Sequence, residues 1–243
     1  ATRLVDMITD KEKTYEAVMR LGVVTDTQDM SGTVLSEVPE FQVTEEELRT
    51  VTESFAGDYM QVPPMYSALK VNGKKLYELA REGKTVERKP RPVHFYEIEI
   101  LDIDFPLVRF RVTCSKGTYI RTLCHDIGEK LGCGAAMETL LRTKVGRFTL
   151  DDAITLAQTE EAVRNGEIEQ RILGIEEILA EYPRVCCTKE GDRLLANGNP
   201  LVQALVNAEE KDGWIRMCNS EGSFAGVYQW DEKRDRYFPV KMF

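Results

Sequence analysis

The sequence has no long run of apolar residues, although 42% of its 243 residues are hydrophobic. A membrane-spanning helix needs about 20 consecutive apolar residues, so the sequence predicts a soluble protein with no membrane attachment. No stretch has the composition of a signal peptide, which favours a cytoplasmic location. A chain of this length can form one large domain, or one medium and one small domain.

Histidine is rare, and the cysteines are not paired. The sequence contains two histidines, and none of its six cysteines has C-x-x-C spacing. This pattern is typical of free thiols in a reducing compartment and argues against a zinc site. Cys124 and His125 are adjacent on a predicted helix, where neighbouring side chains diverge, so a thiol–imidazole dyad is excluded. Cys114 ends a predicted strand and is expected to be a small buried hydrophobe.

Positive charge is scarce overall, with a net charge of −9 and a pI near 5.0. This balance argues against indiscriminate binding to polyanions. One segment differs, because residues 70–91 hold eight basic side chains against three acidic ones. Prolines flank the segment, which suggests an insertion at about residues 63–92. Such a charge run is usually a solvated surface, but it could also lie along an RNA backbone.

One stretch of the chain combines a strand, a sharp turn and a helix start. Residues 107–113 alternate between apolar and polar, as in a half-buried strand. Apolar residues then recur at helical spacing, namely Ile120, Leu123, Ile127 and Leu131. Gly117 permits the turn between them, and Thr118 is the predicted N-cap. A helix start suits a phosphate or carboxylate, and Tyr119 and Arg121 add an aromatic ring and a fixed cation. Pattern alone favours an ordinary capped turn.

The remaining periodicity predicts an α+β domain on a mixed or antiparallel sheet, followed by a small β-barrel-like domain. Strands are expected at residues 14–21, 33–38, 93–103, 108–114, 137–145, 214–218, 224–229 and 237–240. Helices are expected at about residues 44–55 and 74–82, the first with a capping box from Thr44 to Glu47. Residues 57–64 are predicted to be a loop, and 151–179 an acidic helical link.

Several motifs together resemble one family. Cys114-Ser-Lys-Gly-Thr-Tyr-Ile-Arg-Thr-Leu resembles the signature of the bacterial tRNA pseudouridine-55 synthases, the TruB family. Further segments resemble that family in the same order, at residues 13–22, 25–32, 61–70, 76–83, 131–135 and 238–243. The resemblance covers essentially the whole chain. It implies a catalytic domain of pseudouridine-synthase type at residues 1–182 and a PUA-like RNA-binding domain at 183–243.

The resemblance also implies roles for individual residues. The arginine matching Arg121 pairs in the family with the catalytic aspartate and with an aspartate matching Asp29. Tyr15 matches a tyrosine that stacks on the target base, and Tyr119 and Leu140 match positions that line the uridine pocket. Substrate contacts are also expected from three basic residues, Lys116, Lys74 and Lys75. Without the resemblance, Tyr15 is an ordinary sheet aromatic, and Asp29 a turn residue or half of a structural ion pair.

One element of the family pattern is missing. The catalytic aspartate of the family lies in a Gly-x-Leu-Asp-Pro motif, and no such motif occurs in these residues. We therefore expect an N-terminally incomplete synthase, inactive as printed, that acts as a monomer on the T-arm of tRNA without metal or cofactor. The alternative is an RNA-binding or tRNA-folding module without catalysis. The sequence upstream of Ala1 distinguishes the two.

Overall fold

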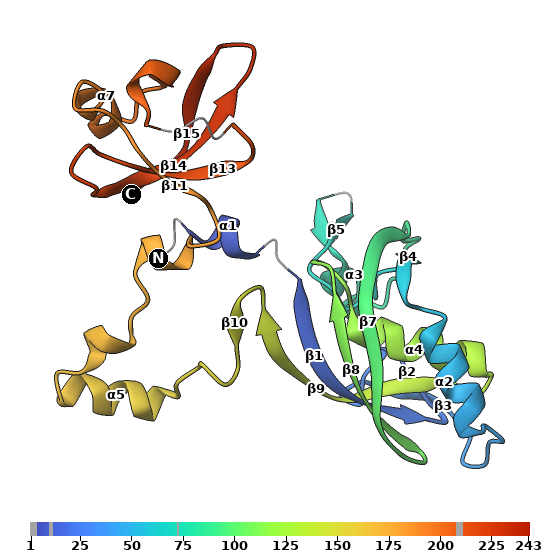
Figure 1. Cartoon of the computed structure of the whole chain (residues 1–243). Coiled ribbons are helices and arrows are strands. Elements are labelled where there is room, and N and C mark those ends of the chain that lie inside the picture. Colours follow the sequence, from blue (N-terminus) through green and yellow to red (C-terminus); the bar gives the residue numbers. More distant parts are fainter. Residues whose placement is uncertain (1–3, 10–11, 72, 208–210) are drawn as a thin grey trace. The chain divides into compact units, whose positions relative to one another are not determined.

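Two compact units make up the computed structural model, which describes residues 4–9, 12–71, 73–207 and 211–243 (Figure 1). One unit is Met7–Ala153, and the other is formed mainly by Ile154–Phe243. The boundary expected from the sequence, between residues 182 and 183, places the acidic segment 154–182 with the first domain instead. That assignment stays a prediction. The opening residues 1–3, which belong to the family resemblance, lie outside the described residues.

A six-stranded antiparallel sheet forms the frame of Met7–Ala153, in the order β10-β9-β1-β8-β7-β4. The strands are β1 (Lys13–Leu21), β4 (Gly57–Gln61), β7 (Arg91–Asp104), β8 (Leu107–Cys114), β9 (Ala135–Val145) and β10 (Phe148–Thr149). The strands predicted at 14–21, 93–103, 108–114 and 137–145 are therefore confirmed. Tyr15 lies on β1, paired with Val112 of β8 on one side and Arg142 of β9 on the other.

The core of this unit lies between the sheet and two helices, α2 (Glu45–Glu53) and α4 (Ile120–Leu131) (Figure 1). Alternation along β8 buries four side chains, Val108, Phe110, Val112 and Cys114. Helical spacing buries four more on α4, namely Ile120, Leu123, Cys124 and Ile127. Full burial of each large aliphatic or aromatic side chain contributes about 1.5–3 kcal/mol. The amphipathic pattern therefore fixes α4 against the sheet.

Local signals in the sequence account for several helix ends. The capping box at Thr44 and Glu47 is present, with both reciprocal hydrogen bonds. Gly132 ends α4 with a left-handed φ of 77°, so the glycine after Leu131 is the C-cap of this helix. The chain's first helix is α1 (Val5–Thr9).

The basic insertion folds as a small hairpin and helix. Strands β5 (Lys70–Val71) and β6 (Lys74–Lys75) pair antiparallel, and α3 (Leu76–Arg81) follows directly. A second hairpin joins β2 (Val23–Thr25) to β3 (Val34–Glu37), which confirms the strand predicted at 33–38. The α3 helix lies within the range predicted at 74–82 and begins two residues later.

Two expectations about secondary structure are wrong in part. Residues 57–61 form strand β4 rather than a loop, because they pair with β7 at the edge of the sheet. That partner is distant in sequence, so local composition does not reveal it. Segment 151–179 is acidic but not one helix, and it breaks into three short elements. These are α5 (Leu156–Arg164), the 3-10 helix η2 (Ile168–Arg171) and α6 (Ile175–Ile178).

The unit formed mainly by Ile154–Phe243 has its own small mixed sheet. Its strands are β11 (Arg184–Cys186), β13 (Trp214–Cys218), β14 (Phe224–Asp231), β15 (Arg236–Met242) and β12 (Leu201–Val202), in that spatial order. β11 runs parallel to β13, and the other pairs are antiparallel. α7 (Asp192–Ala196) and the 3-10 helix η3 (Gln203–Leu205) complete it, around a core that includes Tyr228 and Tyr237. The three strands expected here are confirmed, and β11 and β12 were not anticipated.

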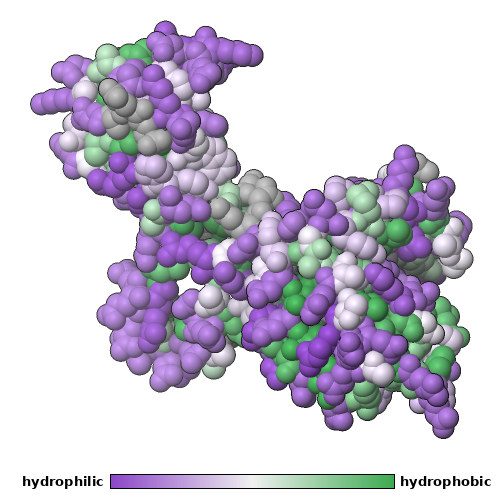
Figure 2. Space-filling view, turned by 45° about the vertical axis from the view of Figure 1, so that its right-hand side comes forward, coloured by the Kyte–Doolittle hydropathy of each residue, from purple (hydrophilic) through white to green (hydrophobic). Residues whose placement is uncertain are grey.

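The face of the chain drawn in Figure 2 is mainly polar. On the face drawn in Figure 2, purple hydrophilic surface surrounds scattered green hydrophobic patches. Within the described residues, no helix is both long and apolar enough to span a bilayer. All six cysteines are free thiols, and Cys114 is fully buried, as expected of a small hydrophobe.

Candidate active site

The turn between β8 and α4 has the predicted conformation but a different cap. Gly117 has a φ of 86°, in the left-handed region that glycine tolerates best. The N-cap of α4 is Tyr119, without a side-chain capping bond, so the prediction of Thr118 as N-cap is wrong. The Thr118 hydroxyl instead donates to the Ser115 carbonyl at 2.8 Å, and this bond lies within the turn that precedes the helix.

A buried glutamine from another strand holds the start of α4. Gln61, at the end of β4, is 1% exposed. Its Oε1 accepts from the Tyr119 N–H at 2.9 Å, and its Nε2 donates to the Tyr119 carbonyl at 3.0 Å. Both polar atoms of the amide are therefore satisfied by one residue's backbone. These two hydrogen bonds fix the position of Tyr119 and the first turn of α4 relative to the sheet.

Arg121, in the first turn of α4, forms an ion pair with Asp29. The Arg121 Nη1 donates to the Asp29 Oδ2 at 2.9 Å, and the two side chains are only 21% and 16% exposed. The Arg121 Nη2 donates to the Tyr66 carbonyl. The Tyr66 hydroxyl in turn donates to Asp26 at 3.3 Å. A carboxylate and a carbonyl thus fix the plane of the guanidinium, as charge-assisted bonds do well.

Asp29 is itself held by several donors from its own loop. Its Oδ1 accepts from the Thr27 hydroxyl at 2.9 Å and from the Ser31 N–H at 3.1 Å. Burial raises the pKa of Asp29, but the bonds from Ser31, Thr27 and Arg121 outweigh burial and hold the pKa below its ordinary value. The carboxylate is therefore ionised at neutral pH.

The loop that carries Asp29 is anchored to strand β9. Asp29 forms an isolated bridge with Met137, and the Met30 N–H donates to the Met137 carbonyl at 2.9 Å. The preceding residue, Gln28, has a φ of 65°, and its side chain accepts from the Thr122 hydroxyl at 2.7 Å. Contacts to both β9 and α4 thus bring Asp29 to Arg121, which lies 92 residues away in sequence.

A pocket of about 230 Å³ lies beside this ion pair. Its lining residues are Tyr15, Thr118, Tyr119, Ile120, Arg121, Met137 and Leu140. Four of the site residues expected from the sequence (Tyr15, Tyr119, Arg121 and Leu140) therefore meet in one place, and Asp29 is bound to one of them. The lining is mostly apolar with one fixed cation, which is the usual composition of a small-molecule pocket.

Tyr15 provides one of the two tyrosine rings of this pocket, from a central strand of the sheet. Burial raises the pKa of Tyr15 above its ordinary value, and Arg142 beside it lowers the pKa by a smaller amount. The phenol is therefore neutral at physiological pH. A half-buried neutral ring can stack on a planar ligand but does not act as a ready base there.

The three expected lysines lie elsewhere. Lys116 is exposed in the turn before α4, and it is not among the lining residues of the pocket. Lys74 and Lys75 lie on β6 in the insertion, where Lys74 pairs with Glu82 at 3.4 Å. Lys75 donates to the Tyr77 hydroxyl at 3.2 Å.

Two residues of the site were not anticipated. Gln61 and Tyr66 belong to a segment that the sequence analysis matched to the family but assigned no role. A buried amide and a backbone carbonyl give no chemical signal in a sequence. The available hint was a polar residue two positions before Pro63-Pro64, at the end of an alternating stretch.

Comparison with known proteins identifies the family. A model described as TruB family pseudouridylate synthase (N terminal domain) matches residues 1–120, and one described as tRNA pseudouridylate synthase B C-terminal domain matches residues 121–180. A protein named tRNA pseudouridine synthase B from Lachnoclostridium phytofermentans is 48% identical, over 100% of this chain and 83% of its own length. The chain belongs to the TruB family of pseudouridylate synthases.

Other relatives agree with this assignment. A tRNA pseudouridine synthase B from Clostridium tetani is 42% identical over 94% of this chain and 78% of its own length. A crystal structure of a Cbf5–Nop10–Gar1 complex contains a chain that matches with a TM-score of 0.71 at 23% identity, over 100% of this chain and 69% of that one. At that identity the likeness establishes the fold alone. The expected α+β architecture with a small C-terminal β domain is thus the architecture of this TruB-family chain.

Proposed function

We propose that this TruB-family protein isomerises uridine 55 in the T-arm of tRNA to pseudouridine, and that the pocket of Tyr15, Tyr119 and Leu140 receives the uridine. The observation that carries the proposal is the Asp29–Arg121 ion pair at the edge of that pocket. The family match and the names of the relatives support the reaction and the substrate class.

The reaction breaks the C–N bond between the base and the sugar, rotates the base and rejoins it through carbon. Atoms and charge balance within the uridine, so the isomerisation needs no cofactor. A base inside a helix cannot rotate, so the uridine must first leave the stack. Tyr15 then stacks on one face of the base, and Leu140 and Tyr119 confine it. The raised pKa of Tyr15 keeps that ring neutral while the base turns.

Arg121 is the residue that prepares the pocket for a carboxylate nucleophile. Asp29 and the Tyr66 carbonyl occupy only part of its guanidinium, and a guanidinium has five N–H donors. The remaining donors can hold a second carboxylate ionised, because a cation at close range favours the charged form. Asp29 acts as a positioning residue, since its carboxylate holds the Arg121 guanidinium in place. The nucleophile of the family motif is not in the printed sequence.

The test compares three polypeptides on one RNA. The first is the 243-residue chain, and the second is the same chain extended with the aspartate-bearing segment of the Lachnoclostridium phytofermentans relative. The third is the extended chain with that aspartate changed to asparagine. We expect pseudouridine from the second alone, although all three bind the tRNA. Turnover by the 243-residue chain would place the nucleophile among these residues and overturn the proposed chemistry.

A further inference from the structure

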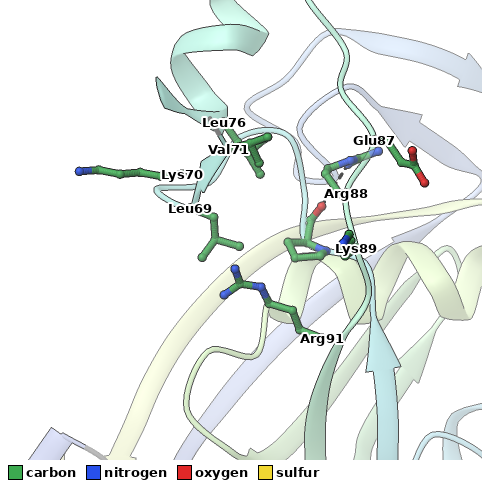
Figure 3. Close-up of a pocket in the computed structure, with 9 residues that line it drawn as sticks. Leu69, Lys70, Val71, Leu76, Glu87, Arg88, Lys89 and Arg91 are labelled. Carbon is green, nitrogen blue, oxygen red and sulfur yellow. Dashed lines mark hydrogen bonds between the residues drawn. The ribbon is translucent and has the colours of Figure 1, made fainter. Parts of the chain in front are cut away.

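A second pocket, of about 250 Å³, lies in the basic insertion. Its lining residues are Pro63, Leu69, Lys70, Val71, Leu76, Glu87, Arg88, Lys89 and Arg91. None of these lines the pocket of Tyr15. Figure 3 shows that these residues come from the β5–β6 hairpin, the start of α3 and the segment that leads into β7.

One wall of this pocket is apolar. Leu76, the first residue of α3, is 1% exposed and anchors the wall, and Leu69 and Val71 are half-buried beside it. Pro63 adds a further apolar surface. An isolated phosphate gains nothing from such a wall, whereas a planar base does, because burial of apolar surface is favourable in proportion to its area.

The other wall carries the cationic side chains of Arg88, Lys89 and Arg91, and Glu87 is the acidic residue in the lining. Among the residues that the structure describes, no carboxylate pairs with Arg91, and its guanidinium lies next to Leu69 in Figure 3. Arg88 donates from Nη1 to the Pro63 carbonyl at 3.1 Å. The Nε of Arg88 is buried, and within the described part of the chain it has no hydrogen-bond acceptor. The hydrogen-bonding capacity of the Arg88 guanidinium is therefore only partly used within the described residues.

We infer that this pocket binds one unpaired nucleotide of the RNA, other than the uridine that is isomerised. Its base lies against Leu69 and the Arg91 guanidinium, and an oxygen of the nucleotide accepts from Arg88. Unpaired bases commonly stack on arginine planes and apolar side chains in this way. The inference rests on the proposed function, since it takes the ligand to be part of the tRNA substrate.

The experiment measures the affinity of the 243-residue chain for a T-arm stem-loop. A set of RNAs is used in which each unpaired nucleotide in turn lacks its base. Arg91→Ala is the test variant, and Lys70→Ala is the matched control. Lys70 lines the same pocket and carries the same charge, but its amino group points away from the other labelled side chains in Figure 3.

With the intact RNA, Arg91→Ala should weaken binding roughly 5- to 100-fold, the range that alanine substitution gives for one stacked base. Lys70→Ala should weaken it only about as much as the loss of one phosphate contact. One abasic RNA, not the one abasic at the isomerised uridine, should bind wild type and Arg91→Ala almost equally. The nucleotide that lacks its base in that RNA is the one that the pocket binds.

The outcomes separate the inference from the proposed function. If Arg91→Ala weakens every RNA by the same factor, Arg91 contacts the backbone and the base pocket is wrong. If Arg91→Ala matches Lys70→Ala, the inference is likewise overturned while the proposed function stands. If Tyr15→Ala is the variant that loses its effect when a base is removed, and it does so only for the RNA abasic at the isomerised uridine, the first pocket is supported. The inference about the second pocket is then overturned. If wild type does not bind the stem-loop, both fail together.

Discussion

The two pockets of Met7–Ala153 have almost the same volume, about 230 and about 250 Å³, but they treat arginine in opposite ways. In the first, Arg121 is held between Asp29 and the Tyr66 carbonyl. In the second, Arg91 is exposed and, within the described residues, has no carboxylate partner. In the first pocket the charge of Arg121 is neutralised by Asp29, and the geometry of the guanidinium is fixed in return. The second keeps its charge available for a polyanion.

The comparison matters because the overall charge of the chain is −9. A protein with this balance attracts RNA only where basic side chains remain unneutralised. Catalysis has a different requirement, since a misplacement of about 1 Å can reduce a rate about 100-fold. We therefore expect substitutions at the first pocket to affect turnover or folding, and substitutions in the insertion to affect binding.

The largest expected effect comes from Arg121→Lys in the extended, active chain. Lysine keeps the charge but cannot contact Asp29 and the Tyr66 carbonyl with one planar group. Turnover under single-turnover conditions should fall about 100-fold, while the Kd for tRNA changes by less than about twofold. An equal loss of affinity and turnover would show that Arg121 binds RNA and does not serve mainly to set the site geometry.

The second prediction concerns the clamp on α4. Gln61→Ala removes both bonds to the Tyr119 backbone and leaves the Tyr119 N–H without this partner, whereas the Tyr119 carbonyl still accepts from the Leu123 N–H at 3.1 Å. The free energy of unfolding should fall by about 1–3 kcal/mol, measured by urea denaturation. Gln42→Ala is the control, because Gln42 is exposed and surface substitutions usually stay within about 0.5 kcal/mol. Equal effects of the two substitutions would mean that Gln61 does not hold the helix.

The third prediction uses the lowered pKa of Asp29. A carboxyl group with a depressed pKa in the folded state stabilises the fold above its unfolded pKa, and this contribution is lost as pH falls through the folded pKa. Wild type should therefore lose stability below about pH 4 more steeply than Asp29→Asn, which has no carboxyl group at this position. Thermal melts at pH 7, 4 and 3 measure the difference. Parallel curves would show that the ion pair contributes no pH dependence.

The smallest effect is expected in the insertion, away from its pocket. Lys74 and Lys84 both pair with Glu82, at 3.4 and 2.7 Å, so part of their charge is already neutralised. The triple change of Lys74, Lys75 and Lys84 to alanine should weaken tRNA binding modestly and flatten its salt dependence. The slope of log K against log salt should fall by less than about 0.9 per lysine. An unchanged slope would identify these lysines as a solvated surface without RNA contacts.

Much of the fold was predictable because its signals are local. Alternation in residues 107–113 and helical spacing after Tyr119 specify β8 and α4 whatever else surrounds them. The Thr44 capping box and the left-handed Gly132 depend on three or four neighbouring residues. The failures were of the other kind. Strand β4 exists because β7 is beside it, and Thr118 does not cap α4 because the helix begins at Ile120, with Tyr119 in the N-cap position.

The candidate site divides in the same way. The sequence alone determined which residue types are available, and its resemblance to the TruB family singled out Tyr15, Asp29 and Arg121 among them. Only the tertiary structure decided that Asp29 reaches Arg121 across 92 residues and that Gln61 holds Tyr119. The physical reason is that a hydrogen bond requires atoms within about 3 Å of each other. Periodicity along a chain fixes which face a side chain occupies, whereas such distances arise only when the strands and helices pack together.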